Sequence, residues 1–196
     1  MPDLTETQSA KAVLRAEVLA RRDALPAAER QTAAETIAAR GLPVEVTPTT
    51  IVSGFMPMKT EVNPIPLMHK LVDVGAQLAL PAIAGRGKPL IMRAWQFGDP
   101  LKAGQWGIRE PLPEAPEVAP DVLIVPLACF DRAGHRIGYG AGYYDMTIRA
   151  LRSKKQVTAI GLAFATQEIS QVPAAPHDER LDLVLTEREV IDFRSA

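Results

Sequence analysis

The stretch DVLIVPLACFDRAGHRIGYGAGYYD, residues 121–145, joins the most apolar run of the chain to a loop rich in glycine. The apolar run, Asp121–Phe130, does not alternate between polar and apolar residues, which is typical of a strand covered on both faces in a parallel sheet. The loop that follows carries Gly138, Gly140 and Gly142, and a helix is expected over Tyr143–Arg152. A buried strand, a glycine loop and a helix in this order predict an α/β protein.

Helical and strand patterns alternate on both sides of this stretch. One helix is expected over Ser9–Leu25, with an apolar stripe of Val13, Leu14, Val18 and Leu25, and others from Pro26 to Gly41 and over Pro64–Gly75. Further strands are expected over Thr50–Met56, Gln77–Ile83, Leu90–Phe97, Val157–Phe164 and Leu181–Thr186, with a hairpin turn at Gly85–Pro89 and an irregular connection at Pro111–Pro120. We therefore expect a layered α/β fold with a largely parallel central sheet flanked by helices, formed by one domain over residues 1–196.

Charge and cysteine content exclude several classes of protein. The net charge of −1 speaks against a nucleic-acid partner. The single cysteine excludes an internal disulfide and suits a reducing compartment. Neither a signal peptide nor an apolar run near the roughly 18 residues of a membrane span is evident. We expect a soluble cytoplasmic protein with small-molecule substrates and no membrane partner, as a monomer or weak homo-oligomer.

The glycine loop has the composition of a phosphate site. Its glycines let a ligand approach the main chain closely, and the helix behind it presents free N–H groups and a positive dipole end. Arg136 adds a planar fork of donors that matches phosphate, and Asp145 offers oxygen ligands for magnesium. The alternative is a tight turn without a ligand, because the loop lacks the Gly-Lys-Ser/Thr of a P-loop and the spacing of a dinucleotide-binding loop.

Other chemically active residues are weaker candidates. Cys129 and His135 could form a thiol nucleophile and its base, but burial in the apolar run would raise the pKa of the thiol and make it inert. The three histidines, His69, His135 and His177, show no metal-ligand spacing.

The segment FDRAGHRIGYGAGYYD, residues 130–145, resembles the signature of the 5-formyltetrahydrofolate cyclo-ligase family, also called methenyltetrahydrofolate synthetases. Four further segments match that family in order and spacing, so that the resemblance covers nearly the whole chain. They are KAVLR (11–15), FMPMKTE (55–61), WGIREP (106–111) and VPAAPHDERLDLVLTE (172–187).

This resemblance implies an enzyme that converts 5-formyltetrahydrofolate and ATP to 5,10-methenyltetrahydrofolate, ADP and phosphate, using magnesium. In the family's mechanism the formyl oxygen attacks the γ-phosphate of ATP. The resulting iminium phosphate loses phosphate when N10 of the folate closes the ring. The protein must align the transfer and neutralise charge, as in other phosphoryl transfers.

The resemblance also implies roles for individual residues. ATP would be bound by Lys11, Arg15, Arg136, Gly138, Gly140, Ala141, Gly142, Tyr143 and Tyr144. The folate would be bound by Met56, Glu61, Trp106, Gly138, Tyr139 and Gly140. Magnesium would be held by Asp145 and Asp182, and Arg136 and Tyr144 would act in catalysis.

From the residues alone, plainer interpretations remain open. Lys11 and Arg15 also fit a solvated charged face, Glu61 an exposed loop acid, and Trp106 a core tryptophan. The sequence does not decide which of the two adjacent tyrosines faces the ligand.

Two positions depart from the family pattern: Ala141 stands where relatives often carry Gly or Lys, and Met146 where many carry Arg. The rival functions are a kinase or phosphatase of a small phosphorylated metabolite, and a regulatory domain that binds nucleotide or folate without catalysis.

Overall fold

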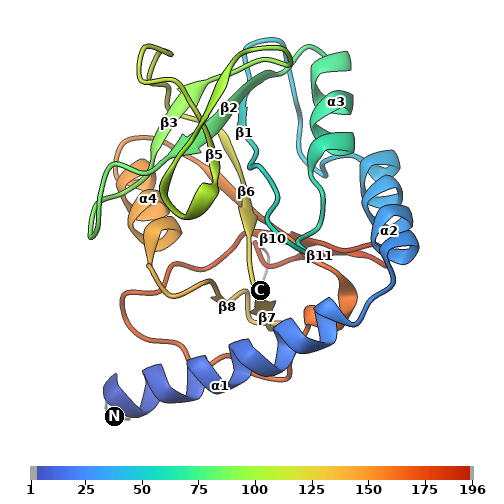
Figure 1. Cartoon of the computed structure of the whole chain (residues 1–196), viewed down its shortest axis with the longest axis vertical. Coiled ribbons are helices and arrows are strands. Elements are labelled where there is room, and N and C mark those ends of the chain that lie inside the picture. Colours follow the sequence, from blue (N-terminus) through green and yellow to red (C-terminus); the bar gives the residue numbers. More distant parts are fainter. Residues whose placement is uncertain (1–3, 195–196) are drawn as a thin grey trace.

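The computed structural model describes residues 4–194, and its centre is a seven-stranded sheet in the order β11-β10-β9-β6-β1-β2-β3 (Figure 1). Five neighbouring strands are parallel, and the two edge strands pair antiparallel. The parallel strands are β1 (Ile51–Ser53), β2 (Gln77–Ala82), β6 (Val122–Pro126), β9 (Thr158–Leu162) and β10 (Leu183–Leu185), and the edges are β3 (Ile91–Ala94) and β11 (Val190–Asp192). The predicted layered α/β fold with a largely parallel sheet is confirmed.

Helices cover both faces of this sheet. Side chains of a strand alternate between faces, so Val122 and Ile124 of β6 join one apolar cluster, while Leu123 and Val125 join another. The first cluster packs under α2 (Ala27–Arg40) and α3 (Ile65–Asp73), and the second under α4 (Tyr143–Arg152), which lies on the opposite side in Figure 1. The central strand is therefore covered on both faces, as its unbroken apolar run predicts.

The apolar run over residues 121–130 forms two strands, where one was expected. After β6 ends at Pro126, β7 (Cys129–Phe130) pairs antiparallel with β8 (Arg136–Ile137) in a separate two-stranded sheet. Residues 127 and 128 link β6 to β7. The buried Gln167 side chain donates to the carbonyls of Leu127 and Ala128, both at 2.9 Å, in place of hydrogen bonds from a neighbouring strand. The glycine loop consequently follows β8 and not the central sheet.

Helix α1 (Leu4–Asp23) begins earlier than expected and faces the body with a different set of residues. Val13, assigned to the apolar stripe, is 66% exposed, and Leu25 lies beyond the end of the helix. Among the side chains of α1 that the structure describes, the buried ones are Thr7, Lys11, Val18 and Arg22. The apolar stripe is therefore wrong in part: α1 packs against β7 and the short η2 (Ala165–Gln167), where Val18 and Leu14 join a small apolar cluster, while Val13 stays outside it.

Two hairpins complete the fold. The turn at Gly85–Pro89 joins the antiparallel strands β2 and β3, as predicted. A second hairpin, β4 (Leu101–Ala103) with β5 (Arg109–Pro111), was not anticipated and carries the one-turn helix η1 (Gln105–Gly107) at its tip. In the described part of the chain, no helix has both the length and the apolar character needed to cross a bilayer.

Candidate functional site

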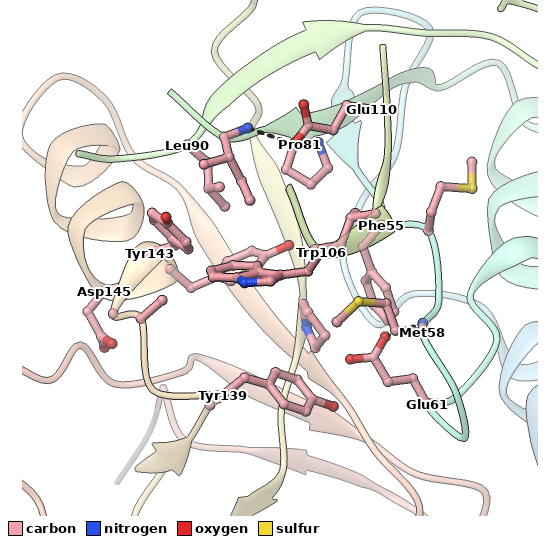
Figure 2. Close-up of a pocket in the computed structure, with 18 of the residues that line it drawn as sticks. Phe55, Met58, Glu61, Pro81, Leu90, Trp106, Glu110, Tyr139, Tyr143 and Asp145 are labelled. Carbon is pink, nitrogen blue, oxygen red and sulfur yellow. Dashed lines mark hydrogen bonds between the residues drawn. The ribbon is translucent and has the colours of Figure 1, made fainter. Parts of the chain in front are cut away.

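A cavity of about 370 Å³ opens beside the carboxyl ends of β1 and β6 (Figure 2). Ligands of open α/β sheets bind at this edge, and the volume is typical of a small-molecule site. Three segments line it: the loop after β1, the β4–β5 hairpin with the adjoining end of β2, and the glycine loop with the start of α4. Their lining residues include Phe55, Met56, Met58, Lys59, Glu61, Pro81, Ile83, Trp106, Ile108, Glu110, Arg136, Gly138, Tyr139, Ala141, Gly142, Tyr143, Tyr144 and Asp145.

The glycine loop leaves its main chain free for a ligand. Gly140 (φ 100°) and Gly142 (φ 68°) adopt left-handed backbone that favours glycine, whereas Gly138 does not. A Cβ on Gly138 or Gly142 would meet nothing within 4 Å, so this side of the loop is open. None of the N–H groups of residues 138–145 donates to another residue in the described range 4–194. Free N–H groups at the start of a helix form an anion site.

Arg136 and Asp145 meet at one end of the cavity. The buried Arg136 guanidinium donates through Nη2 to Asp145 Oδ1 at 2.9 Å and through Nη1 to the Glu179 carbonyl. The Glu179 N–H donates to the same Oδ1 at 3.0 Å. The two bonds thus converge on one oxygen, and neither uses Oδ2 of this cavity-lining carboxylate.

Lys11 and Arg15 approach the same region from one face of α1. Arg15 donates through Nε to the Gly138 carbonyl at 2.6 Å, and its guanidinium lies 3.8–3.9 Å from where a Gly140 Cβ would be. Lys11 is 6% exposed and forms an ion pair with Asp178. A solvated charged face is therefore excluded for Lys11, which does not line the cavity, while Arg15 contacts the glycine loop.

Glu61 marks the other end of the cavity, across Trp106 from Asp145 (Figure 2). It is buried, not an exposed loop acid, and its Oε2 accepts from the Met58 N–H at 2.7 Å. Burial raises the pKa of Glu61, while the Met58 N–H, the Tyr139 hydroxyl and the Arg22 guanidinium oppose that rise.

Trp106 is a cover of the cavity and not a core residue. Its side chain is 64% exposed, and its own backbone is left-handed with φ 58°. The indole and the Tyr143 ring lie 6.2 Å apart, while Tyr144 also packs against the core cluster under α4. Both tyrosines line the cavity, and Tyr143 is the one that faces Trp106. Burial raises the pKa of the Tyr144 hydroxyl.

Asp182, the second expected magnesium ligand, does not line this cavity. Its Oδ2 accepts from Arg152 Nη2 at 2.8 Å and from the Ala159 N–H at 2.7 Å. Asp145 and Arg152 stand in the first and last turns of α4, about 10 Å apart along its axis. Within residues 4–194, no cluster of three or more His, Cys, Asp or Glu side chains could hold a metal. Asp145 lines the cavity and Asp182 does not, so the role of Asp182 stays a prediction.

Asp145 by itself fits the requirements of magnesium. Magnesium usually takes one or two carboxylates and completes its shell with phosphate oxygens and water. A single carboxylate with one unengaged oxygen, next to a phosphate-binding loop, satisfies that pattern.

Two cavity-side residues escaped sequence reasoning. Arg22 continues the helical spacing of Lys11, Arg15 and Val18, so the spacing alone could have indicated it. Glu110 is buried, accepts from the Ile83 N–H at 3.1 Å and packs so closely on Gly104 that a Cβ there would lie 2.3 Å from its carboxyl carbon. Glu110 lies within the family motif WGIREP, residues 106–111, and this position could have indicated it as a site residue.

Cys129 is buried, as expected, and does not belong to the site. The thiol is buried, and burial raises its pKa to about 11. It is not among the residues that line the cavity.

Comparison with known proteins gives a consistent result. The model of the 5-formyltetrahydrofolate cyclo-ligase family matches residues 7–187. The chain is 32% identical over 189 residues to the 5-formyltetrahydrofolate cyclo-ligase of Mycolicibacterium smegmatis, covering 92% of this chain and 95% of that protein. It is 30% identical over 150 residues to the Escherichia coli K12 enzyme of the same name, covering 72% and 80%.

Solved structures agree with this result. The 5,10-methenyltetrahydrofolate synthetase of Aquifex aeolicus superposes with a TM-score of 0.75 at 28% identity, covering 95% of this chain and 94% of that chain. The Mycoplasma pneumoniae synthetase, at 23% identity and a TM-score of 0.70, covers 90% and 98% and shares the fold.

Proposed function

Because the chain belongs to the 5-formyltetrahydrofolate cyclo-ligase family, we propose that it converts 5-formyltetrahydrofolate and ATP to 5,10-methenyltetrahydrofolate, ADP and phosphate, with magnesium. One observation carries the proposal. A single cavity holds a glycine loop with free N–H groups at one end, and a buried carboxylate under an exposed tryptophan at the other. Such a cavity suits a nucleotide and a flat heterocycle that must meet.

The reaction has two bond-forming steps. The formyl oxygen attacks the γ-phosphorus of ATP, and ADP leaves. The carbon of the resulting iminium phosphate is then attacked by N10, which closes the five-membered ring, loses its proton and expels phosphate. The protein's part is to hold the formyl oxygen in line with the γ-phosphate and to exclude water that would compete for it.

The phosphates belong at the α4 end. There the loop N–H groups, the N-terminus of α4 and the cations Arg136 and Arg15 favour an anion. Magnesium, when bound, would neutralise charge on the phosphates, and Asp145 is the cavity carboxylate that fits it. Lys11 would have to exchange Asp178 for a phosphate oxygen to reach the nucleotide.

The folate belongs at the Glu61 end. A carboxylate there can accept hydrogen bonds from the N–H donors of the pterin. Trp106 and Tyr143 offer ring faces on which the flat heterocycle can stack, and Met56 and Phe55 add apolar wall.

The decisive test mixes the purified protein with 5-formyltetrahydrofolate, ATP and magnesium, and follows the ultraviolet band of the methenyl product. We expect turnover that stops when either ATP or the divalent metal is omitted. Phosphate release without the methenyl band would favour the kinase or phosphatase alternative. Ligand binding without turnover would favour a regulatory domain.

A further inference from the structure

Arg22 is a buried cation of α1 that contacts both substrate loops. It is 3% exposed and lies behind the Glu61 end of the cavity, where it shares a small hollow with Glu61. Its Nη1 donates to the Tyr139 hydroxyl at 2.7 Å, and its Nε donates to Thr60 Oγ1 at 3.0 Å. Tyr139 belongs to the glycine loop, and Thr60 precedes Glu61 in the loop after β1.

The direction of these bonds is fixed by Arg22. A guanidinium only donates, so both hydroxyl oxygens must accept from it and each keeps its own proton free. Thr60 uses its proton on Asp23. Tyr139 can use its proton on Glu61, whose carboxylate it faces. Arg22 therefore leaves the Tyr139 hydroxyl proton free to point toward Glu61.

We propose that Arg22 is a positioning residue for the folate: by holding Tyr139 and Thr60 together, it joins the glycine loop to the Glu61 loop and orients the Glu61 carboxylate. The inference rests on the proposed function, because it assigns Glu61 to the folate. Arg22 itself acts through its two partners, so removing it should loosen the carboxylate without touching the phosphate end.

Electrostatics supports the same role. Glu61 is faced by Arg22 from α1, by Tyr139 from the glycine loop and by Tyr144 from α4, and Lys59 of its own loop lines the cavity. Of these groups, Arg22 is the cation that opposes the effect of burial on the pKa of Glu61. Its loss should raise that pKa further, so folate binding should begin to weaken at a higher pH.

The test compares Arg22→Gln with Arg21→Gln, a matched control because Arg21 is the exposed neighbour on the same helix. Folate affinity is read from the change in tryptophan fluorescence, to which Trp106 contributes from the cavity and Trp95 from outside it, and ATP affinity from titration calorimetry. We expect Arg22→Gln to raise the folate Kd roughly tenfold, the cost of one hydrogen-bonded charge, with the ATP Kd unchanged. Arg21→Gln should change neither.

A second variant separates positioning from a general loss of structure. Tyr139→Phe keeps the ring and removes only the hydroxyl that accepts from Arg22 and lowers the pKa of Glu61. It should weaken folate binding by itself, and adding it to Arg22→Gln should cost less than the sum of the single effects. The pH at which folate binding is half lost should rise in both variants.

The outcomes can be told apart. If the wild type binds no folate, the proposed function fails. If the wild type binds folate and Glu61→Gln weakens it while Arg22→Gln does not, only the role of Arg22 is wrong. Arg22→Gln with a lower Tm but an unchanged folate Kd and pH profile would also overturn it, because Arg22 would then serve stability alone.

Discussion

The three glycines of the loop are required for different reasons: two for their backbone conformation and one for the space that it leaves open. Gly140 and Gly142 hold left-handed backbone, so a side chain there strains the chain whatever space is available. Gly138 has ordinary backbone and open space around its Cα, so a side chain there would only take up ligand room.

Gly140→Val tests whether the loop serves a ligand. We expect a folded protein whose ATP Kd is raised about tenfold or more, because backbone strain of order 1–3 kcal/mol would distort the phosphate-binding N–H groups. The measurement is titration of both proteins with ATP, together with their Tm values to show that the variant is folded. Gly138→Ala should keep Tm and Ala141→Lys should be tolerated, since relatives carry Lys there. Normal ATP binding by Gly140→Val would mean that the loop is only a turn.

Arg136→Lys should not behave as a conservative change. Arg136 bonds Asp145 and the Glu179 carbonyl through two different guanidinium nitrogens. Lysine has one ammonium nitrogen, so it cannot reproduce this geometry, and it lacks the planar group that matches phosphate. We expect weaker ATP binding and a folate Kd near that of the wild type, by calorimetry. Arg132→Lys, at an exposed arginine paired with Glu168 and Glu189, is the control. Equal ATP affinity in both variants would remove Arg136 from the phosphate site.

Glu61→Gln should stabilise the free protein while it weakens folate binding. Burial raises the pKa of Glu61 above its unfolded value of 4.5, so the folded state loses stability as pH rises through that interval. At pH 7 the neutral amide avoids this cost, and Tm should rise by roughly 2–4 °C for each kcal/mol recovered. Below pH 4.5 the difference in Tm should vanish. A lower Tm at pH 7 would show that the carboxylate supports the fold.

Local pattern predicted the elements whose signals are local. The helix α4 has the predicted bounds, and the hairpin turn at Gly85–Pro89 and the parallel central strands followed from composition and apolar runs. The strands themselves are shorter than predicted: β1 covers only Ile51–Ser53. Pairing partners, which no local pattern contains, decide where a strand stops.

Three features depend on distant residues and could not be predicted. The split of the apolar run relies on Gln167, about forty positions later in the chain. Val13 is exposed because α1 packs on Cys129 and Ile137 through Val18 and not through Val13. Trp106 becomes a cavity cover only because the β4–β5 hairpin folds back with Glu110 against Gly104. The candidate site was predicted where the family motifs lie, and Arg22 was missed because it lies outside them.

The β6–β7 link gives a prediction at the scale of elements. Gln167→Leu would leave two buried carbonyls and the Phe164 N–H without their side-chain partner. We expect the free energy of unfolding to fall by about 2–4 kcal/mol, from urea titration. Gln171→Leu, at an exposed position, should change little. Equal effects of the two variants would show that Gln167 does not hold the link.

At the scale of the whole molecule, the central sheet is buried between apolar clusters, whereas the N-terminal helix α1 buries mostly polar side chains. Among the described side chains of α1, Val18 is the one apolar residue that is fully buried, whereas β6 and β9 lie between two apolar clusters. Elements with few buried apolar contacts open most easily.

Amide hydrogen exchange should therefore be faster in α1 than in β6 and β9 of the free protein. ATP should slow exchange in α1 selectively, since Arg15 touches the glycine loop and would be held by the nucleotide. Exchange measured by mass spectrometry, with and without ATP, checks both statements. Uniform protection across α1 and the sheet would contradict this division.

The buried thiol of Cys129 should make the chain a convenient host for chemical labelling. With one native cysteine, sealed in an apolar cluster and protonated at neutral pH, maleimide dyes would find no target in the folded protein. A cysteine introduced on the surface would then be modified alone. Lys102 is an exposed residue of the β4–β5 hairpin, so the variant Lys102→Cys would carry a dye there. The dye would report how Trp106, on the same hairpin, moves when each substrate binds.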